Sequence, residues 1–427
     1  MFTVSGDSCL PVRRSTALHT ESLQSHHPWN LQGPRRTAVL LFACVATAMA
    51  VLPRGAWAQQ LRLSNPLGID RSQEVVEIPL AQVAEHLHPS AEKLQDLVAL
   101  DTATQQRIPS QLYSQQADAA PDTLLLLIQL PAHGVLNVSF HLAPAAPPQP
   151  PLVFGREAAE RKDDFAWENL LVAYRVYGPA LQATGEIASG IDVWSKRIPN
   201  FVIDNFYKRD LEGRQTHNHA LSYHKDNGQG LDSYEVGHSR GCGGTAVWAN
   251  GKLYVSKNYI TKKILGKGPI RFAFEVSYAP WDADGRMVAE TKRITLDAGT
   301  HLNMIASTYT FDGPPLELAA AIAIHEGADA TIPAEGRIAS VWDTPQDPSA
   351  GRIATGLVAL PNQHARTVLA AHHALMIFAR RSSAPFTYFA GSGWSKADMP
   401  TEDAWNAYLT SFLNQREHPA TLRWTKH

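Results

Sequence analysis

Residues 222–244, SYHKDNGQGLDSYEVGHSRGCGG, bring together the side-chain types that acid–base chemistry requires. Histidine takes up or releases a proton near neutral pH, a neighbouring carboxylate orients its imidazole, and tyrosine supplies a second proton donor. Arginine binds the carboxylate of a ligand through two parallel hydrogen bonds. The segment therefore predicts a catalytic group, made up of Tyr223, His224, Asp226, Tyr234 and Arg240.

Tryptophans beside Ser-Lys pairs predict the rim of a binding cleft. The pattern occurs twice, as GIDVWSKR at 190–197 and as GSGWSKAD at 391–398. Aromatic side chains with a few charged neighbours are typical of ligand sites, and flat aromatic faces suit the apolar faces of sugar rings. The predicted substrate-binding residues are Trp194, Lys196, Arg197, Asp232 and Trp394.

A third group, just before the main segment, raises the question of a metal. The sequence HNHALSYHKD places His217 and His219 two residues apart, so they would share a face of an extended chain. Imidazole and carboxylate groups bind divalent cations, but the spacing matches no closed structural zinc site. Three interpretations stay open for the histidine-rich region: a divalent cation site, an acid–base pair, or polarity at the surface.

Glycines and the lone cysteine of the same segment carry separate expectations. The glycines indicate backbone that turns tightly or approaches a ligand closely. A catalytic cysteine needs a base and a lowered pKa, and the closeness of His238 to Cys242 in the sequence does not place the two together in space, so we expect a buried, small apolar side chain at Cys242. Ser239 lies outside any G-x-S-x-G sequence, which gives no support to a serine hydrolase.

The N-terminus has the features of a secretion signal. Arg35 and Arg36 precede an apolar run that ends at AWA, residues 56–58. Cleavage after Ala58 would remove two of the three cysteines and leave no internal disulfide. We expect a periplasmic or secreted protein without a membrane segment after cleavage. A net charge of -2, without a basic stripe, argues against a nucleic-acid partner.

The chain divides in the sequence into a leader and two β-rich parts. After residues 1–58, a small β domain is expected over 59–143, with strands at 74–80, 123–130 and 134–142 and a short helix between the first two. The strand at 123–130, TLLLLIQL, is apolar throughout and indicates burial on both faces. A proline-rich linker at 144–154 follows.

Residues 155–427 are expected to form one large antiparallel β-sandwich with a C-terminal helix. Seven strand-like runs alternate with turn residues, and Asn250-Gly251 predicts a tight hairpin. A helix is expected over 401–415, opened by Thr401, with its apolar residues on one face. The fold class is therefore mainly β.

Longer stretches of the chain resemble a known family. These are LSNPLGIDRSQEVVEIP, WENLLVAYRVYGPAL, SGIDVWSKR, YHKDNGQGLDSYEVGHSRGCGG and ETKRITLDAGTHLN. They are similar to bacterial secreted proteins of the domain-of-unknown-function family 4861, in which a typical member reads YHEDHGEGLDFY. His224, Asp226, Asp232 and Tyr234 match this motif, and three positions, Asn227, Gln229 and Ser233, depart from it. The resemblance implies a place in carbohydrate degradation, often of pectin and other uronic-acid polymers, and a galactose-mutarotase-like large domain.

Three functions remain as hypotheses. The first is a lyase that cleaves acidic oligo- or polysaccharides by β-elimination, for which the segment 222–244 supplies a base, an acid and a cation. The second is a glycoside hydrolase or an epimerase, with Asp226 or Asp232 paired with Glu275 or Glu290. The third is a carbohydrate-binding protein without catalysis.

Overall fold

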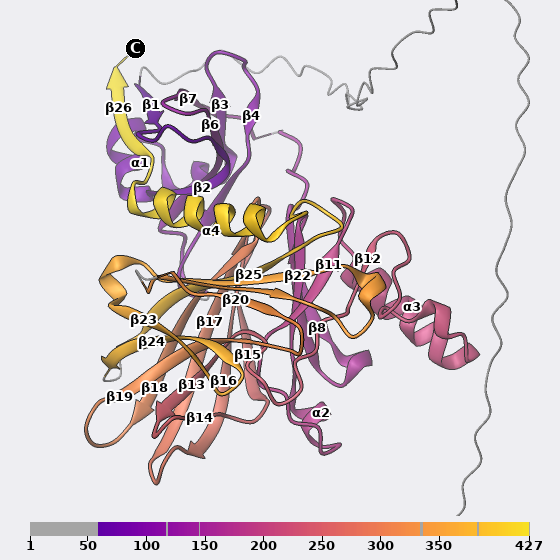
Figure 1. Ribbon diagram of the computed structural model, residues 1–427. Helices are drawn as coiled ribbons and strands as arrows, with labels where there is room; N and C mark the ends of the chain where they lie inside the picture. Colours follow the sequence, from indigo (N-terminus) through magenta and orange to yellow (C-terminus); the bar gives the residue numbers. More distant parts are fainter. Residues whose placement is uncertain (1–58, 117, 145, 334–335, 382–383, 427) are drawn as a thin grey trace, which may run out of the picture. The chain divides into compact units, whose positions relative to one another are not determined.

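A computed structural model describes residues 59–116, 118–144, 146–333, 336–381 and 384–426 (Figure 1). The expected signal segment, residues 1–58, lies outside the described residues. The described chain is built mostly of antiparallel strands, which confirms the predicted mainly-β class. No helix within the described part is long and apolar enough to cross a membrane.

The N-terminal part forms a small sandwich of two sheets. Sheet A has the order β26-β1-β7-β3-β4 and sheet B the order β2-β6-β5. Their strands are β1 (Gln59–Ser64), β2 (Arg71–Pro79), β3 (Leu97–Asp101), β4 (Arg107–Ile108), β5 (Ser110–Tyr113), β6 (Thr123–Leu130), β7 (Val135–Leu142) and β26 (Thr421–Lys426). Helix α1 (Leu80–Leu87) stands at the predicted place and buries Leu80, Val83 and Leu87.

The C-terminal strand β26 belongs to a sheet of the N-terminal sandwich, although the sequence predicted it as part of the large domain, residues 155–427. β26 pairs along its length with β1, from Gln59 opposite Lys426 to Ser64 opposite Thr421. The indole of Trp424 packs on Phe140 and stacks on His86. The N-terminal sandwich therefore contains the last strand of the described chain.

Strand β6 is buried on both faces, as its apolar run predicted. Leu124, Leu126 and Ile128 face the core of the N-terminal sandwich, whereas Leu125 and Leu127 pack into the core of the following sandwich. Since successive strand side chains point to opposite faces, one strand serves two cores.

The large sandwich pairs an eight-stranded sheet with a five-stranded one. Sheet D has the order β14-β13-β19-β24-β23, and sheet E has the order β15-β16-β17-β18-β25-β22-β21-β20. The strands are β13 (Cys242–Ala249), β14 (Lys252–Tyr254), β15 (Tyr259–Lys267), β16 (Arg271–Asp282), β17 (Met287–Asp297), β18 (Leu302–Phe311), β19 (Leu316–Ala323), β20 (Asp329–Thr331), β21 (Ile338–Asp343), β22 (Ile353–Val358), β23 (Ala365–Ala370), β24 (His373–Arg381) and β25 (Phe386–Trp394).

The predicted hairpin and C-terminal helix are both confirmed. Asn250 and Gly251 have φ of 50° and 71° and join β13 to β14. Helix α4 (Glu402–Glu417) begins after Thr401, whose side chain accepts a hydrogen bond from the Ala404 amide. In Figure 1 α4 crosses between the N-terminal strands and sheet E, where it packs on β21 and β22.

A third sheet of the C-terminal part carries the candidate site. Sheet C has the order β12-β11-β10-β9-β8, formed by β8 (Val153–Ala158), β9 (Asp164–Asn169), β10 (Val172–Val176), β11 (Asp192–Lys196) and β12 (Gly230–Leu231). One face packs into the core of the large sandwich and the other is covered by α3 (Ile203–Thr216). The short helices are α2 (Pro179–Gln182), η1 (Ala91–Asp96), η2 (Ala159–Arg161), η3 (His219–Leu221), η4 (Pro348–Ala350) and η5 (Pro361–Gln363).

Helix α3 was not among the predicted elements. Its sequence, IDNFYKRDLEGRQT, has no clear apolar stripe, and its Ncap residue, Val202, offers no side-chain cap. The cap comes from β9 instead, because Glu168 accepts hydrogen bonds from the amides of Val202 and Ile203. Lys196 compensates the charge of Glu168 at 2.7 Å. A buried ion pair in sheet C thus fixes the start of the helix.

Candidate active site

Three carboxyl groups surround one arginine on the α3-facing side of sheet C. Arg175 lies in β10 and binds Asp192 of β11 through Nε at 2.8 Å and Nη2 at 2.5 Å. Its Nη2 also reaches Asp232 at 2.9 Å, and its Nη1 lies 3.5 Å from Asp164 of β9. All four side chains are at most 6% exposed. We call these four residues the Arg175 cluster.

Burial keeps protons on part of the Arg175 cluster. It raises the pKa of Asp164 to about 6, against the opposing effect of Arg175. Burial also raises the pKa of Asp232 well above its ordinary value, and the neighbouring Asp192 acts in the same direction. A buried site with more carboxylates than cations favours retention of protons, and this tuning is characteristic of acid–base sites.

Three further side chains, two half-buried and one exposed, border the Arg175 cluster or contact Tyr223 beside it. Tyr177 is half-buried and its Oη donates to Asp192 Oδ2 at 3.0 Å. Arg161, also half-buried, donates from Nε to Tyr223 Oη at 2.9 Å. The His224 side chain is 56% exposed and lies with Nδ1 3.7 Å from Asp232 Oδ2. These three residues form the outer layer of the site.

The hydrogen bond of His224 determines which ring nitrogen is free. Nδ1 lies 2.9 Å from the carbonyl oxygen of Asp232, which can only accept, so Nδ1 carries the proton. In the neutral ring Nε2 therefore has a lone pair available as a base. Desolvation lowers the pKa of His224, and Arg175 adds to this, so the ring is neutral at pH 7. Desolvation raises the pKa of Tyr177 well above 10, so the phenol keeps its proton.

The structure brings some of the predicted catalytic residues to this site and separates others from it. Tyr223 is buried, and its Oη accepts from Arg161 and Arg175. Asp226 lies at the outer edge of the loop, paired with Arg197 at 2.6 Å. Tyr234 is buried in the core of the large sandwich, with its ring against His325. Arg240 lies within the same sandwich, 2% exposed.

The predicted substrate-binding residues divide in the same way. Trp194 is fully buried under α3, and Lys196 is bound to Glu168 and to the carbonyl of Asn169. Their placement favours structural roles, since neither reaches the surface. Arg197 is exposed and its guanidinium lies 5.0 Å from the ring of Trp394, which is itself buried. Asp232 belongs to the Arg175 cluster.

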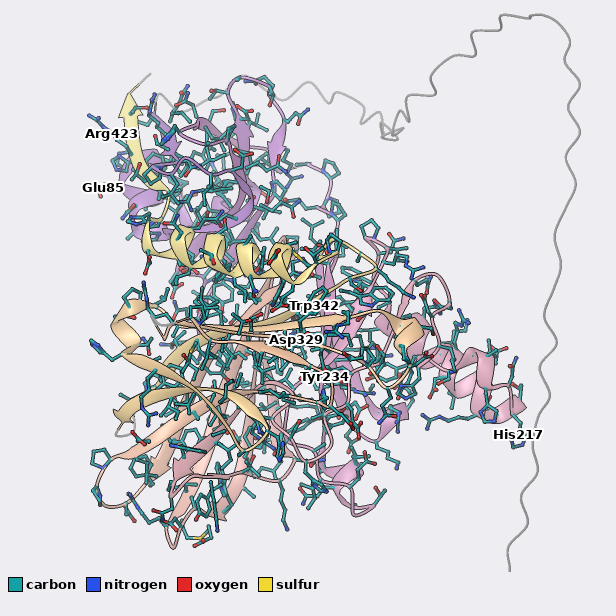
Figure 2. The ribbon with its side chains drawn as sticks, in the orientation of Figure 1. Glu85, His217, Tyr234, Asp329, Trp342 and Arg423 are labelled. Carbon is teal, nitrogen blue, oxygen red and sulfur yellow. The ribbon has the colours of Figure 1, made fainter. Side chains whose placement is uncertain are left out.

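No metal site forms around the predicted histidines. His217 caps the end of α3 and His219 begins η3, both exposed. Figure 2 shows His217 at the outer end of α3, far from Tyr234. Within the described ranges no three His, Cys, Asp or Glu side chains gather in a way that could hold an ion.

The glycines of the segment mainly allow close packing of backbone. A Cβ at Gly230 would lie 2.0 Å from the Ser195 carbonyl oxygen, and one at Gly241 would lie 2.2 Å from that of Ile191. Gly228 and Gly237 adopt positive φ in open turns. Cys242 is buried, as expected, and burial raises the pKa of its thiol.

The carboxylate pair of the hydrolase hypothesis does not assemble. Glu290 is buried between sheets D and E, where it accepts from Thr245 and Ser307. Glu275 is half-buried on the opposite face of sheet E, opposite Arg293 in the register. Neither side chain shares the α3-facing side of sheet C with Asp232.

Sequence reasoning missed Arg161, Asp164, Arg175, Tyr177 and Asp192. The last four could have been found, because they stand in or next to apolar strands whose neighbours must be buried: FAWEN, VAYRVYG and IDVWSK. A charged side chain in such a strand requires a partner, and several of them on adjacent strands indicate a cluster. Arg161 lies in a short 3-10 turn and has no such pattern.

The fold and the site define a two-sandwich β protein with a buried cluster of one arginine and three carboxyl groups on a separate sheet. The chain belongs to the family described as Domain of unknown function (DUF4861), whose model matches residues 63–422. The chain is 28% identical to "Uncharacterized protein P7" of Formosa agariphila over 403 residues. This alignment covers 90% of this chain and 98% of that protein.

Two solved structures are weakly similar. They are an alpha-mannosidase and a protein in the glycosyl hydrolase family 38, both from Enterococcus faecalis, at 10% and 11% identity and a TM-score of 0.45 each. The alignments cover 88% of this chain but only 47% and 48% of those chains, so the chain spans about half their length. This similarity is too low to define a fold relationship.

Proposed function

We propose that the protein is a carbohydrate-active enzyme that cleaves an acidic, uronate-containing saccharide by β-elimination at the outer layer of the Arg175 cluster. One observation carries the proposal. The side chains around the cluster are an exposed imidazole, a half-buried tyrosine whose hydroxyl donates to Asp192, and a half-buried arginine, whereas the carboxyl groups of the cluster are at most 3% exposed.

Each of the three outer groups fits one part of the reaction. His224 Nε2 takes the proton from C5 of the uronate, and Arg161 stabilises the negative charge that develops on the adjacent carboxylate. Tyr177 gives its proton to the oxygen that leaves C4. The C5–H and C4–O bonds break, a C4=C5 double bond forms, and both protons are accounted for.

The carboxyl groups then act by positioning the outer layer. Asp192 accepts from Tyr177 and fixes the direction of the phenol, and the Asp232 carbonyl fixes the tautomer of His224. Glycoside hydrolysis would require two carboxyl groups in contact with the sugar. The three carboxyl groups of the cluster are at most 3% exposed, which favours elimination over hydrolysis.

The family resemblance supports the substrate class, since it implies a place in the degradation of uronic-acid polymers. Secretion after removal of residues 1–58 is part of the proposal, because polymeric substrates lie outside the cell. Epimerisation at C5 would begin with the same proton abstraction, and the product distinguishes the two reactions.

The test is an assay of the purified chain starting at Gln59 on a panel of uronate polymers and oligosaccharides. A lyase gives the ultraviolet absorbance of an unsaturated uronate together with new reducing ends. Reducing ends without that absorbance identify a hydrolase, and deuterium exchange at C5 without cleavage identifies an epimerase. Binding measured by calorimetry, with the ligand unchanged after long incubation, identifies a binding protein.

A further inference from the structure

A second polar cluster lies inside the large sandwich, away from the outer layer of the Arg175 cluster. It contains two cations, Arg240 and Lys292, which are 2% and 1% exposed. Glu290 and Lys292 stand two residues apart in β17 and both face the core, and Arg240 comes from the segment before β13. Tyr278 and Tyr309 lie beside these charges.

The one carboxylate of this cluster is already shared. Glu290 Oε1 accepts from Thr245 at 2.5 Å and from Ser307 at 2.6 Å, and Lys292 Nζ lies 3.5 Å from the same oxygen. Lys292 Nζ also lies 5.0 Å from the centre of the Tyr278 ring. The charge of Lys292 is therefore compensated by Glu290 across this 3.5 Å separation.

Arg240 has no carboxylate partner among the described residues. Its side chain donates only to the Thr245 carbonyl at 3.4 Å and to Ser189 Oγ at 3.1 Å. Two cations and one carboxylate leave one positive charge in excess in an enclosed core. An uncompensated buried charge is costly, and the two acceptors of the guanidinium, a carbonyl and a hydroxyl, are both neutral.

From this imbalance we propose that Arg240 and Lys292 hold one small monovalent anion, chloride or the carboxylate of a small acid, between sheets D and E. The anion supplies the missing negative charge and accepts from the guanidinium and the ammonium group. Burial lowers the pKa of both cations, which is the expected direction when the protein itself provides too little countercharge. The inference is independent of the reaction proposed above.

Thermal unfolding in different sodium salts tests the site. The midpoint is compared in chloride, bromide and formate against gluconate, which is too bulky to enter, at equal ionic strength. We expect the midpoint to rise by at least about 2 °C with the anion that binds. A response to halides identifies chloride as the ligand, and a response to formate alone identifies a carboxylate.

A matched pair of variants separates binding from general stability. Arg240→Met should abolish the response, whereas Arg271→Met should keep it, because Arg271 is an equally buried arginine paired with Glu77 and Asp297. Lys292→Met replaces Arg240→Met if the latter does not fold. Crystals of the unmodified protein in bromide should show anomalous scattering beside Arg240. No such peak, together with no response to halide or formate, would overturn the proposal.

Discussion

His224 is the residue on which the proposed chemistry depends most directly. Its side chain is 56% exposed and contributes little to a core, so His224→Ala should fold normally. Without the free Nε2, turnover should fall by about 100-fold or more, the usual scale for loss of a general base. The measurement is kcat and the unfolding midpoint on the same preparation.

The matched control for this variant is His219→Ala, a second exposed histidine in the loop that follows α3. His219→Ala should leave both kcat and the unfolding midpoint unchanged. If His224→Ala instead lowered the midpoint while turnover per folded molecule stayed near the wild-type value, the ring would be a structural residue that ties the loop to Asp232.

Tyr177→Phe tests the proton donor. Phenylalanine keeps the ring, which lies 5.0 Å from the Arg175 guanidinium, but removes the hydroxyl that donates to Asp192. We expect kcat to fall by about 100-fold with a small change in KM, since the phenol acts at the leaving oxygen and not in binding. Tyr254→Phe, which removes a phenol bonded to Asp284 elsewhere, should have no effect on kcat.

The lowered pKa of His224 and the raised pKa of Tyr177 predict how kcat/KM depends on pH. The base must be neutral, so the rate falls as the pH drops through the pKa of His224, which desolvation places below 6.5. The acid must be protonated, and the pKa of Tyr177 lies well above 10, so the rate should not fall on the alkaline side before about pH 10. A bell-shaped profile centred near neutral pH would contradict these assignments.

At the residue scale the segment predicted from the sequence lies only partly at the Arg175 cluster. Local clustering led to His224, Tyr223 and Asp232, which do meet around Arg175. Residues 234–244 belong to the same dense segment, yet the chain carries them into the large sandwich. Spacing along the chain does not determine which sheet a loop enters, so Tyr234 and Arg240 were grouped with residues they do not contact.

At the element scale, α3 is held by an interaction that its own sequence does not show. Glu168 of β9 binds the first helical amides and Lys196 of β11, with both side chains fully buried. The sequence of α3 shows no N-terminal capping residue because the group that caps it, Glu168, lies about 34 residues before Val202 in the chain. The local sequence correctly predicted α1 and α4, whose apolar faces lie within the helices themselves, and α4 also has a local cap at Thr401.

Glu168→Gln tests this dependence. Glutamine keeps one carbonyl oxygen that can accept from the Val202 and Ile203 amides, but it carries no charge and its NH2 group cannot accept from Lys196. The substitution therefore leaves Lys196 as a buried cation without a carboxylate partner. We expect the free energy of unfolding to fall by about 3–5 kcal/mol. Denaturant titration measures the loss, and Glu160→Gln, which changes an ion pair near the surface, serves as the control with a loss of about 1 kcal/mol or less.

At the scale of the whole molecule, the strands of sheet B connect two cores. Val75, Leu125 and Leu127 pack into the large sandwich, while Val76 and Leu126 on the same strands fill the N-terminal one. Gln111 binds the amides of Ile270 and Arg271, and Arg271 reaches Glu77 in β2. A proline-rich segment therefore separates two parts of the chain that remain joined by packing.

This shared packing predicts that residues 59–143 do not fold alone. The excised fragment would expose Val75, Tyr113, Leu125 and Leu127 and would lack β26, the partner of β1. Burial of four such side chains is worth roughly 6–12 kcal/mol, as much as the whole stability of a typical domain. Circular dichroism of the fragment should show no cooperative transition, and calorimetry of the chain from Gln59 onward should show a single one. A fragment that melts cooperatively, or two separate transitions in the full chain, would mean that the two sandwiches are independent domains, as the sequence alone predicted.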